Sequence, residues 1–402
     1  MADRSFYSTY YLFFLDLKKL ILYLETKITP LTISEYNITM RNDRLAKIFC
    51  EIAVIEGLSG NELEVGNYIK SFLENLSLHP QMDNSACQTK SNSGNIICKI
   101  NGGGNFLLSC HMDTARSTKS LNPVFTEDRI VSSGETVLGV DNRSGIAIML
   151  LLAEKIAREK IPVKGFTLAF ATCEETTLGG SKYMEIDKEI KRAFVFDSQN
   201  HPGKFINSSY GAAGFKIEII GKASHSGISP EKGINAFDIM IHALEGQTYG
   251  RIQPELTFNI GKIYGGTATN VVPDNIILEG EVRSVNLKNV EAKIDELKFQ
   301  FEQVACKLGG SVNFFWNWDF TPFIVTPQSE TYHMICDAIN KAGLTTEAVI
   351  SSAGSDANSY NNRGIEAVNI GIGAQNPHSN EEYILYKDFK NAFNIALELV
   401  KE

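Results

Sequence analysis

The sequence lacks the features that mark several classes of protein. None of its seven cysteines forms a C-x-x-C pair, and an odd, scattered set of thiols is typical of a reducing, cytoplasmic compartment. Lys and Arg number 38 against 47 Asp and Glu, a formal net charge of −9, so neither nucleic acid nor an anionic membrane is expected as a partner. The apolar stretch at residues 6–24 is broken by Asp16, Lys18 and Lys19, which argues against a membrane span.

The length and composition indicate a folded protein of two domains. A chain of 402 residues with 43% hydrophobic and 21% charged residues exceeds one ordinary core. Residues 1–40 differ in character from the rest, and Met40 opens a more ordinary sequence. We expect this N-terminal extension to be either an upstream segment from a misplaced start or an accessory helix.

Acidic and imidazole side chains follow three short apolar runs directly. The runs are 105–110 before His111, 166–173 before Glu174 and Glu175, and 193–196 before Asp197. Continuous apolar runs are typical of buried strands in a mostly parallel sheet. Because open α/β sheets place their sites at the carboxyl ends of the strands, these side chains are predicted to meet at one sheet edge. A metal-dependent hydrolase is the leading interpretation.

The order of predicted elements indicates a small domain inserted into a large one. Strands and helices alternate up to about residue 207 and again from about residue 321, which predicts a mixed, mostly parallel sheet flanked by helices. Between these parts the pattern is β-α-β-β-α-β, the split βαβ (ferredoxin-like) α+β fold. The predicted elements are 213–220, 235–244, 256–263, 276–285, 288–308 and 311–320. We therefore expect a discontinuous catalytic domain (41–207 and 321–402) and an inserted domain at 208–320 for dimerisation or lid closure.

Local patterns assign chemistry to several of these residues, each with a simpler alternative. In His111-Met-Asp113 the imidazole can bind a metal while Asp113 accepts its other ring N–H, although such a pair is also common on surfaces. Asp141 precedes an apolar helical stretch at 145–157, where a carboxylate is often a helix N-cap. With ligands on neighbouring strand ends, it becomes a bridge between two metals.

Two adjacent carboxylates, Glu174 and Glu175, form the sharpest local signal. At a buried strand end they repel unless one is protonated or a cation is present, whereas on a solvated loop they would be an ordinary charge pair. The preceding apolar run favours the buried case, with Glu175 as a metal ligand and Glu174 as the general base for a metal-activated water. Asp197 and His378 complete a set that suits two Zn²⁺, with Co²⁺ or Mn²⁺ as alternatives.

A further pattern, Ser59-Gly-Asn-Glu62, has the S-x-x-E spacing of a capping box. It predicts that a helix begins there and continues to about Leu76.

Taken together, these motifs resemble the dinuclear zinc peptidases, the family that includes peptidase T, carboxypeptidase G and the aminoacylases. The resemblance covers residues 41–402 and follows the family's order of metal ligands. Three further segments match its motifs: 221–236, 267–273 and 354–357. The insert lies between Asp197 and His378, an arrangement that resembles the peptidase T type. Two positions depart from that type, Ala115-Arg-Ser-Thr118 after Thr114 and Asn142-Arg143 after the bridging Asp141.

The resemblance implies roles that the spacing alone does not give. Asp141 would bridge two metals, with His111 and Asp197 on one and Glu175 and His378 on the other. His225 would stabilise the oxyanion in the partner subunit's site of a homodimer.

It also implies that Asn270 and Arg283 help to hold the substrate, Arg283 through a carboxylate. The expected function is a zinc-dependent aminopeptidase that acts on short peptides, a tripeptidase, with Glu174 as general base. The alternatives are a carboxypeptidase or N-acyl amino-acid deacylase with the same metal centre and, from a different class, a non-catalytic zinc-binding scaffold.

Overall fold

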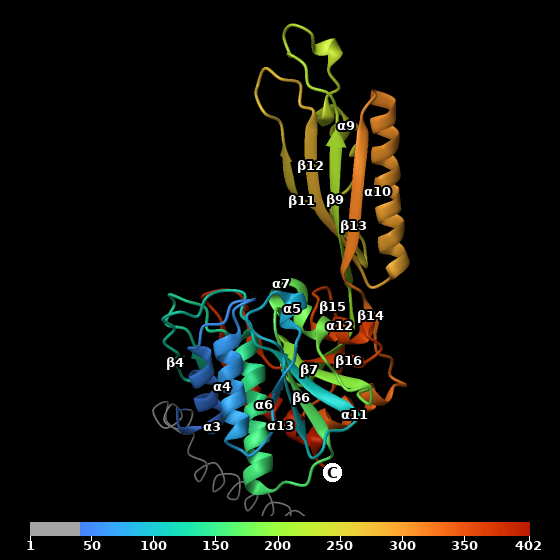
Figure 1. Cartoon of the computed structure of the whole chain (residues 1–402). Coiled ribbons are helices and arrows are strands. Elements are labelled where there is room, and N and C mark those ends of the chain that lie inside the picture. Colours follow the sequence, from blue (N-terminus) through green and yellow to red (C-terminus); the bar gives the residue numbers. More distant parts are fainter. Residues whose placement is uncertain (1–40) are drawn as a thin grey trace, which may run out of the picture.

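The computed structural model describes residues 41–402, so the predicted N-terminal extension at 1–40 lies outside the described residues. The described chain forms a large α/β part from which a smaller, elongated α+β part projects (Figure 1). Each part has its own hydrophobic core. Among the helices of residues 41–402, none combines the length and the apolar character that crossing a membrane requires.

A nine-stranded mixed sheet forms the centre of the large part. Its strands are β1 (Gln81–Met82), β2 (Ile96–Ile100), β3 (Phe106–His111), β6 (Phe166–Ala171), β7 (Arg192–Ser198), β8 (Lys204–Ser209), β14 (Phe323–Ile324), β15 (Glu347–Ser351) and β16 (Glu366–Gly371). They lie in the order β1-β2-β6-β3-β7-β16-β8-β14, with β15 beside β8. The four central strands β6, β3, β7 and β16 are parallel. The pairings β1–β2, β2–β6, β16–β8 and β8–β14 are antiparallel, and β15 pairs parallel with β8. The predicted mixed sheet is confirmed, and its parallel strands occupy the centre.

Helices cover both faces of this sheet, as the fully buried strand β3 requires. They are α3 (Arg44–Ala53), α4 (Leu63–Glu74), α5 (Ala86–Thr89), α6 (Val140–Glu159), α7 (Glu174–Thr177), α8 (Gly179–Tyr183), α11 (Glu330–Lys341), α12 (Asp356–Asn362) and α13 (Tyr386–Val400). The Ser109 hydroxyl lies 2.8 Å from that of Tyr360 on α12, whereas the next side chain, Cys110, contacts Met149 on α6. Because successive strand residues point to opposite faces, α6 and α12 lie on opposite sides of the sheet.

A second, four-stranded sheet supports the loop that carries His378. Its order is β17-β18-β5-β4. The strands are β4 (Val124–Phe125), β5 (Arg129–Val131), β17 (Ala374–Gln375) and β18 (Tyr383–Leu385). His378 lies in the connection between β17 and β18, which pair antiparallel.

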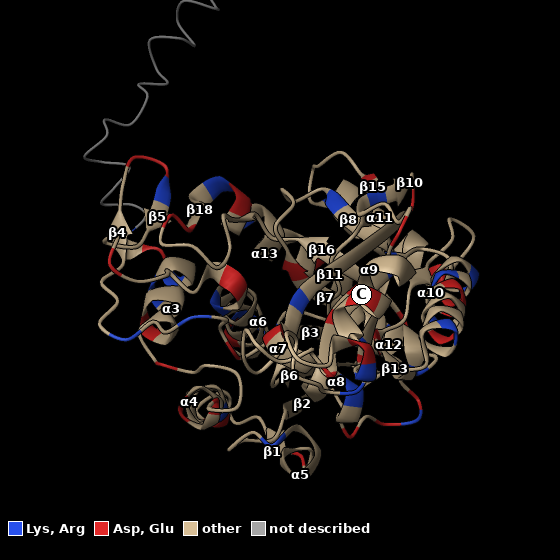
Figure 2. Ribbon diagram, turned by 90° about the horizontal axis from the view of Figure 1, so that it is seen from above, with Lys and Arg blue, Asp and Glu red and all other residues tan. Residues whose placement is uncertain are grey.

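The smaller part is a five-stranded antiparallel sheet with two helices on one face (Figure 1). Its elements are β9 (Gly211–Ile220), a 3₁₀ turn (Pro230–Lys232), α9 (Ala236–Ala243), β10 (Gly250–Gln253), β11 (Leu256–Gly265), β12 (Asn275–Ser284), α10 (Leu287–Leu308) and β13 (Ser311–Phe320). The strand order β11-β12-β9-β13 is that of the predicted split βαβ fold, with the short β10 added at one edge. In Figure 2, Lys and Arg are interspersed with Asp and Glu along α10 and elsewhere rather than gathered in one stripe.

The chain crosses between the two parts at adjacent points. β8 ends at Ser209 and β9 begins at Gly211, while β13 ends at Phe320 and β14 begins at Phe323. A Cβ at Gly211 would lie only 2.4 Å from Cδ of Pro322. The close approach of the two crossing segments therefore requires glycine at this position.

The predicted capping box at Ser59 is wrong. Helix α4 begins at Leu63, and the Ser59 hydroxyl instead donates to Oδ2 of Asp113 at 2.6 Å. The Glu62 carboxylate is fully buried and accepts hydrogen bonds from the backbone N–H groups of Gly60 and Cys173. Both side chains have tertiary partners near the strand ends, so neither is available to cap the helix.

Candidate metal centre

The structure brings together all six residues that the sequence predicts at one sheet edge. They are His111 at the end of β3, Asp141 at the start of α6, Glu174 and Glu175 after β6, Asp197 in β7, and His378 in the β17–β18 connection. Parallel strands end at the same sheet edge, and this explains why residues so far apart in sequence converge.

Asp141 lies between two His–carboxylate pairs. Its Oδ1 is 3.0 Å from Nε2 of His111, which is itself 3.2 Å from Oδ1 of Asp197. Its Oδ2 is 3.6 Å from Nε2 of His378, which is 2.9 Å from Oε2 of Glu175. Ligand atoms of His111, Asp141 and Glu175 all lie within 4.8 Å of one another. Imidazole nitrogens and carboxylate oxygens at this spacing fit divalent cations such as Zn²⁺.

The carboxyl groups at this centre resist ionisation in the absence of a cation. Burial raises the pKa of Glu174 well above its usual range and also raises that of Glu175. Burial, together with the charge of Asp141, raises the pKa of Asp197 to about 6. Asp141 is the exception: burial opposes ionisation, but hydrogen bonds from His111 and His378 outweigh it and lower the pKa. A buried cluster of acids with these properties is one that a bound cation would stabilise.

Asp113 joins the His111 strand to the Glu174–Glu175 turn. Its Oδ1 and Oδ2 accept the backbone N–H groups of Glu174 and Glu175, each at 3.1 Å. Nδ1 of His111 lies 3.4 Å from Oδ1 of Asp113 and 3.0 Å from the carbonyl oxygen of the same residue. Asp113 therefore approaches the second ring nitrogen through both its side chain and its backbone.

One of the two segments that depart from the peptidase T pattern, Asn142-Arg143, is buried next to this centre. The peptide bond between Asp141 and Asn142 is cis, and the Asn142 amide donates to Oδ1 of Asp197 at 2.9 Å and to the Phe196 carbonyl oxygen at 2.8 Å. The Arg143 guanidinium donates to the carbonyl oxygens of Met112 and Ile55. Asn142, which follows Asp141 directly, thus links it to Asp197, and Arg143 links the start of α6 to the end of β3.

Two buried acids at the centre had no assigned role in the sequence analysis. Asp356 lies in the matched segment 354–357, but neither of its carboxylate oxygens has a hydrogen-bond partner in the described chain. The neighbouring Ser181 hydroxyl donates instead to the Leu178 carbonyl oxygen, and burial raises the pKa of Asp356 to about 7. Glu382 accepts three backbone N–H groups, and burial raises its pKa to about 7 despite them. In the sequence, the only sign of a role for Glu382 was its position four residues after His378.

Two cavities meet at the candidate centre. One, of about 580 Å³, lies between the centre and the base of the small part and is lined by Arg283, Lys182 and Asp319 among others. The other, of about 410 Å³, is lined by residues of β8 and β15, including Ile206 and Val349. Glu174, Glu175 and His378 line both cavities, so a substrate could extend to either side of the centre.

Arg283 faces this centre with part of its hydrogen-bonding capacity already used. It makes two hydrogen bonds of 2.9 Å to Glu281 and a third, of 3.2 Å, to the Ser352 carbonyl oxygen. Among the predicted substrate-binding residues, Arg283 is the one that the structure brings to the metal cluster.

The structure does not bring His225 and Asn270 to the centre of their own chain. His225 lies in the connection between β9 and α9, and Asn270 in the connection between β11 and β12. Figure 1 shows both connections at the end of the small part away from the large part. The two connections meet where the Ser226 N–H donates to the Asn270 carbonyl oxygen. Nδ1 of His225 accepts the backbone N–H groups of Gly227 and Ile228, each at 3.2 Å. Because Nδ1 is an acceptor, the neutral ring carries its proton on Nε2.

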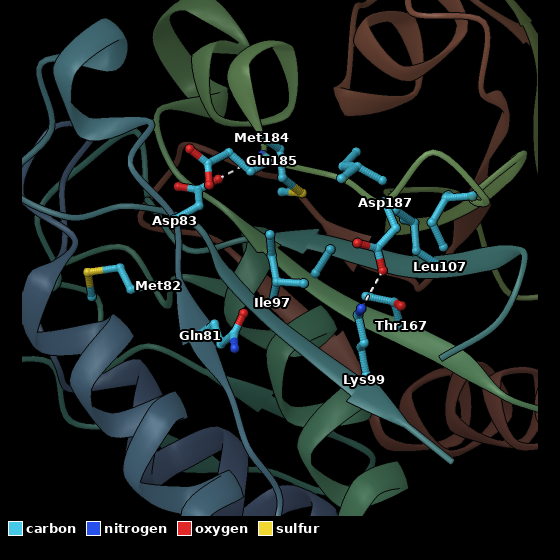
Figure 3. Close-up of a pocket in the computed structure, with 13 residues that line it drawn as sticks. Gln81, Met82, Asp83, Ile97, Lys99, Leu107, Thr167, Met184, Glu185 and Asp187 are labelled. Atoms are coloured by element: carbon cyan, nitrogen blue, oxygen red, sulfur yellow. Dashed lines mark hydrogen bonds and ion pairs between the residues drawn. The ribbon is translucent and has the colours of Figure 1, made fainter. Parts of the chain in front are cut away.

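A third cavity, of about 110 Å³, lies elsewhere on the large part (Figure 3). Its wall contains the ion pair between Lys99 and Asp187, 2.5 Å apart, and the hydrogen bond from the Glu185 N–H to Asp83. The Asp83 carboxylate also accepts bonds from Ser85 and Asn95. Each charged side chain that lines this cavity thus has an ion-pair or hydrogen-bond partner, Glu185 through the Asn84 amide.

Comparisons with known proteins agree with the geometry. Residues 207–307 match the peptidase dimerisation domain of the M20 family, and residues 95–224 match peptidase family M28. An uncharacterised protein, YqjE, from Bacillus subtilis (strain 168) is 28% identical over 365 residues, which is 89% of this chain and 98% of that protein.

Two crystal structures are similar over nearly the same range. Aminopeptidase PepT from Bacillus cereus ATCC 10987 has a TM-score of 0.82 at 28% identity, and a tripeptidase from Staphylococcus aureus has 0.84 at 27%. Each comparison covers 89% of this chain and 97% of the other. The matched domains, the strand order and the similarity to PepT and the tripeptidase together support a peptidase T-like member of the M20 peptidases.

Proposed function

We propose that this metallo-exopeptidase uses two Zn²⁺ to release the N-terminal residue of short peptides, tripeptides in particular. The observation that carries the proposal is the position of Asp141, with one carboxylate oxygen toward His111 and the other toward His378. One cation would be held by His111, Asp197 and Asp141, and the other by Glu175, His378 and Asp141. When bound, two such cations polarise a carbonyl group and lower the pKa of a water molecule.

Glu174 is the proposed general base and, later, the acid that protonates the leaving amine. Its Oε2 lies 4.0 Å from Nε2 of His111, farther than the carboxylates of Asp141 and Asp197, so it is the acid least engaged with the imidazoles. It lines both cavities, where the scissile bond would lie. Its backbone N–H is fixed by Asp113, so the turn that carries it is held in place.

Arg283 is proposed to bind the carboxylate of a short peptide. It lines the larger cavity together with Glu174 and Glu175, on the side of the centre toward the small part. Two of its five N–H groups remain for substrate, because Glu281 and the Ser352 carbonyl oxygen take the others. Because Arg283 lines the same cavity as Glu174 and Glu175, a substrate whose C-terminal carboxylate binds Arg283 would have to be short for its scissile bond to reach the centre.

We further propose a homodimer formed through the small part, in which His225 and Asn270 of one subunit complete the site of the other. The match of residues 207–307 to a peptidase dimerisation domain supports this assembly. Exposed apolar side chains lie on α9 (Phe237, Ile241) and on the C-terminal half of β11 (Ile263, Tyr264). The outward Nε2–H of His225 is the donor that an oxyanion requires.

The proposed compartment is the cytoplasm. All seven cysteines are unpaired, and Cys98, Cys110 and Cys173 are buried. This pattern is typical of proteins kept in a reducing environment.

Two other functions remain as alternatives to the proposal. A carboxypeptidase or N-acyl amino-acid deacylase would use the same metal residues, and a zinc-binding scaffold would bind the metal without hydrolysis. Hydrolysis of a tripeptide, of its N-acetylated form and of its C-terminal amide separates them. The proposal expects cleavage that needs a free α-amine and releases the first residue; cleavage of the acetylated peptide would favour the deacylase or carboxypeptidase, and zinc binding without any cleavage the scaffold.

A further inference from the structure

Glu382 connects two loops that carry proposed metal ligands. It lies at the end of the β17–β18 connection and is only 2% exposed. Its Oε2 accepts the backbone N–H groups of Gly139 at 2.6 Å and Val140 at 3.3 Å, immediately before Asp141. Its Oε1 accepts the backbone N–H of His378 at 2.7 Å. Each oxygen therefore serves a different loop.

Two of the residues whose N–H groups bind Glu382, Gly139 and His378, have a backbone in the left-handed region. The φ angles of Gly139 and His378 are 71° and 65°, and the second is in a residue with a Cβ, for which the left-handed region is unfavourable. The N–H groups of these same two residues are the ones that Glu382 accepts. A charge-assisted hydrogen bond to each is a reason that both loops keep these conformations.

Few other side chains hold the His378 loop. The Arg116 guanidinium donates to the His378 carbonyl oxygen at 3.2 Å, but at an exposed position where water competes. Two further side-chain bonds, from Ser379 to the Asn376 carbonyl oxygen and from Asn376 to the Glu381 carbonyl oxygen, stay within the loop and are exposed. The Asn380 amide donates to the Gly134 carbonyl oxygen at 3.1 Å, which is also an exposed contact. Among these contacts, only Glu382 is both buried and bonded to a second ligand-bearing segment.

We propose that Glu382 is a positioning residue that sets the separation of Asp141 and His378 and so prepares the binding site of the second cation before the metal arrives. This inference rests on the metal ligands of the proposed function. The ligands would come from Asp141, Glu175 and His378, while Glu382 itself would touch neither metal nor substrate. Outer residues that orient metal ligands typically change metal affinity 10- to 100-fold when they are replaced.

Because each carboxylate oxygen of Glu382 accepts N–H groups from a different loop, Glu382→Gln should release one loop and leave the other bound. A glutamine side chain has one acceptor oxygen, so it can serve one loop only, and its NH₂ group would face N–H donors of the other. Glu382→Asp keeps the charge and both oxygens but is one methylene shorter, so it also reaches only one loop. Glu381→Gln is the matched control, because Glu381 is adjacent, exposed and equally charged.

The test measures the full-length protein at pH 8, where the carboxylate is ionised, first without metal and then during titration with Zn²⁺. Hydrogen exchange of the backbone amides of Gly139, Val140 and His378 is measured in the metal-free state, and the number and affinity of bound Zn²⁺ by calorimetry. We expect Glu382→Gln to speed exchange in at least one loop about 10-fold and to weaken one of two Zn²⁺ by 10- to 100-fold. Activity should recover at saturating Zn²⁺ with KM unchanged, and Glu381→Gln should match the parent protein throughout.

Two equivalents of Zn²⁺ bound with parent affinity, or unchanged exchange of all three amides, would overturn the proposal. If Glu382→Gln does not fold, Glu382→Asp is judged by the same criteria. Neither readout needs a substrate, so weakened Zn²⁺ binding in a protein that cleaves no tripeptide would overturn the proposed function and support this inference. Tripeptide cleavage by a Glu382→Gln protein with two tightly bound Zn²⁺ would do the reverse.

Discussion

Removal of the metal should make the stability of this protein fall as the pH rises from 5 to 8. The pKa of Asp356 is raised from 3.8 to about 7 by burial, and that of Asp197 to about 6. An acid whose pKa is higher in the folded state than in the unfolded chain binds more protons in the folded state at every pH between those two pKa values. The free energy of unfolding therefore decreases across this window.

His378 acts in the same direction at higher pH. Hydrogen bonds to Asp141 and Glu175 raise its pKa to about 10, so its contribution is complete below pH 6.5 and is lost as the pH approaches 10. Asp141, with its lowered pKa, loses its contribution only in acid, below this range. Asp197, Asp356 and His378 therefore all make the free energy of unfolding decrease as the pH rises from 5 to 8.

Asp356 gives the magnitude that can be measured most cleanly. It is buried, makes no hydrogen bond in the described chain and is not a proposed metal ligand. A shift of about three pH units corresponds to roughly 4 kcal/mol, as an order of magnitude. We therefore expect Asp356→Asn to be more stable than the parent by up to about 4 kcal/mol at pH 8, and by about 1.6 kcal/mol at pH 5, because the carboxyl group of the unfolded chain is already ionised at pH 5.

The assay is denaturant unfolding with a chelator present, at pH 5, 6, 7 and 8, for the parent and Asp356→Asn. Added Zn²⁺ should remove most of the pH dependence, since a cation neutralises the carboxylates that protons otherwise neutralise. A metal-free stability that stays constant or rises toward pH 8 would refute the reasoning. Equal slopes for the parent and Asp356→Asn would show that the Asp356 carboxylate is not the group that titrates.

Three further predictions concern the reaction itself. Glu174→Gln should lower kcat by about 10²- to 10⁴-fold with two Zn²⁺ still bound, as metal analysis and steady-state kinetics will show; full activity would exclude Glu174 as the base. Arg283→Met should raise KM for a tripeptide by about 10- to 100-fold, and its effect should disappear with the C-terminal amide; equal loss on both substrates would exclude carboxylate binding. Inactive Glu174→Gln and His225→Ala chains, when co-expressed, should regain about a quarter of parent activity, because half of random dimers carry one intact shared site. No recovery in dimers verified by mass would exclude the shared site.

The sequence was sufficient to predict that the proposed metal ligands cluster, because the strands do most of the positioning. His111, Glu175 and Asp197 each stand at or near the end of a buried apolar run, and parallel strands of this kind end at one edge. The inserted fold was predictable for a similar reason: the alternation of β9 and the long amphipathic helix α10 are local patterns.

The rest could not be predicted because it depends on contacts between distant loops. The Ser59–Glu62 spacing fits a capping box, yet Asp113 and Cys173, far along the chain, are the partners of those two side chains. Glu382 likewise gains its role from Gly139, which is 243 residues away. Neither local propensity nor periodicity contains information on such pairings.

The measurement that tests the central claim most directly is hydrolysis of a free tripeptide and its N-acetylated form by chelated protein, with and without added Zn²⁺. The account predicts Zn²⁺-dependent release of the first residue from the free tripeptide and no cleavage of the acetylated one. Cleavage of the acetylated tripeptide, or release of the first residue in the presence of excess chelator, would contradict a zinc-dependent aminopeptidase.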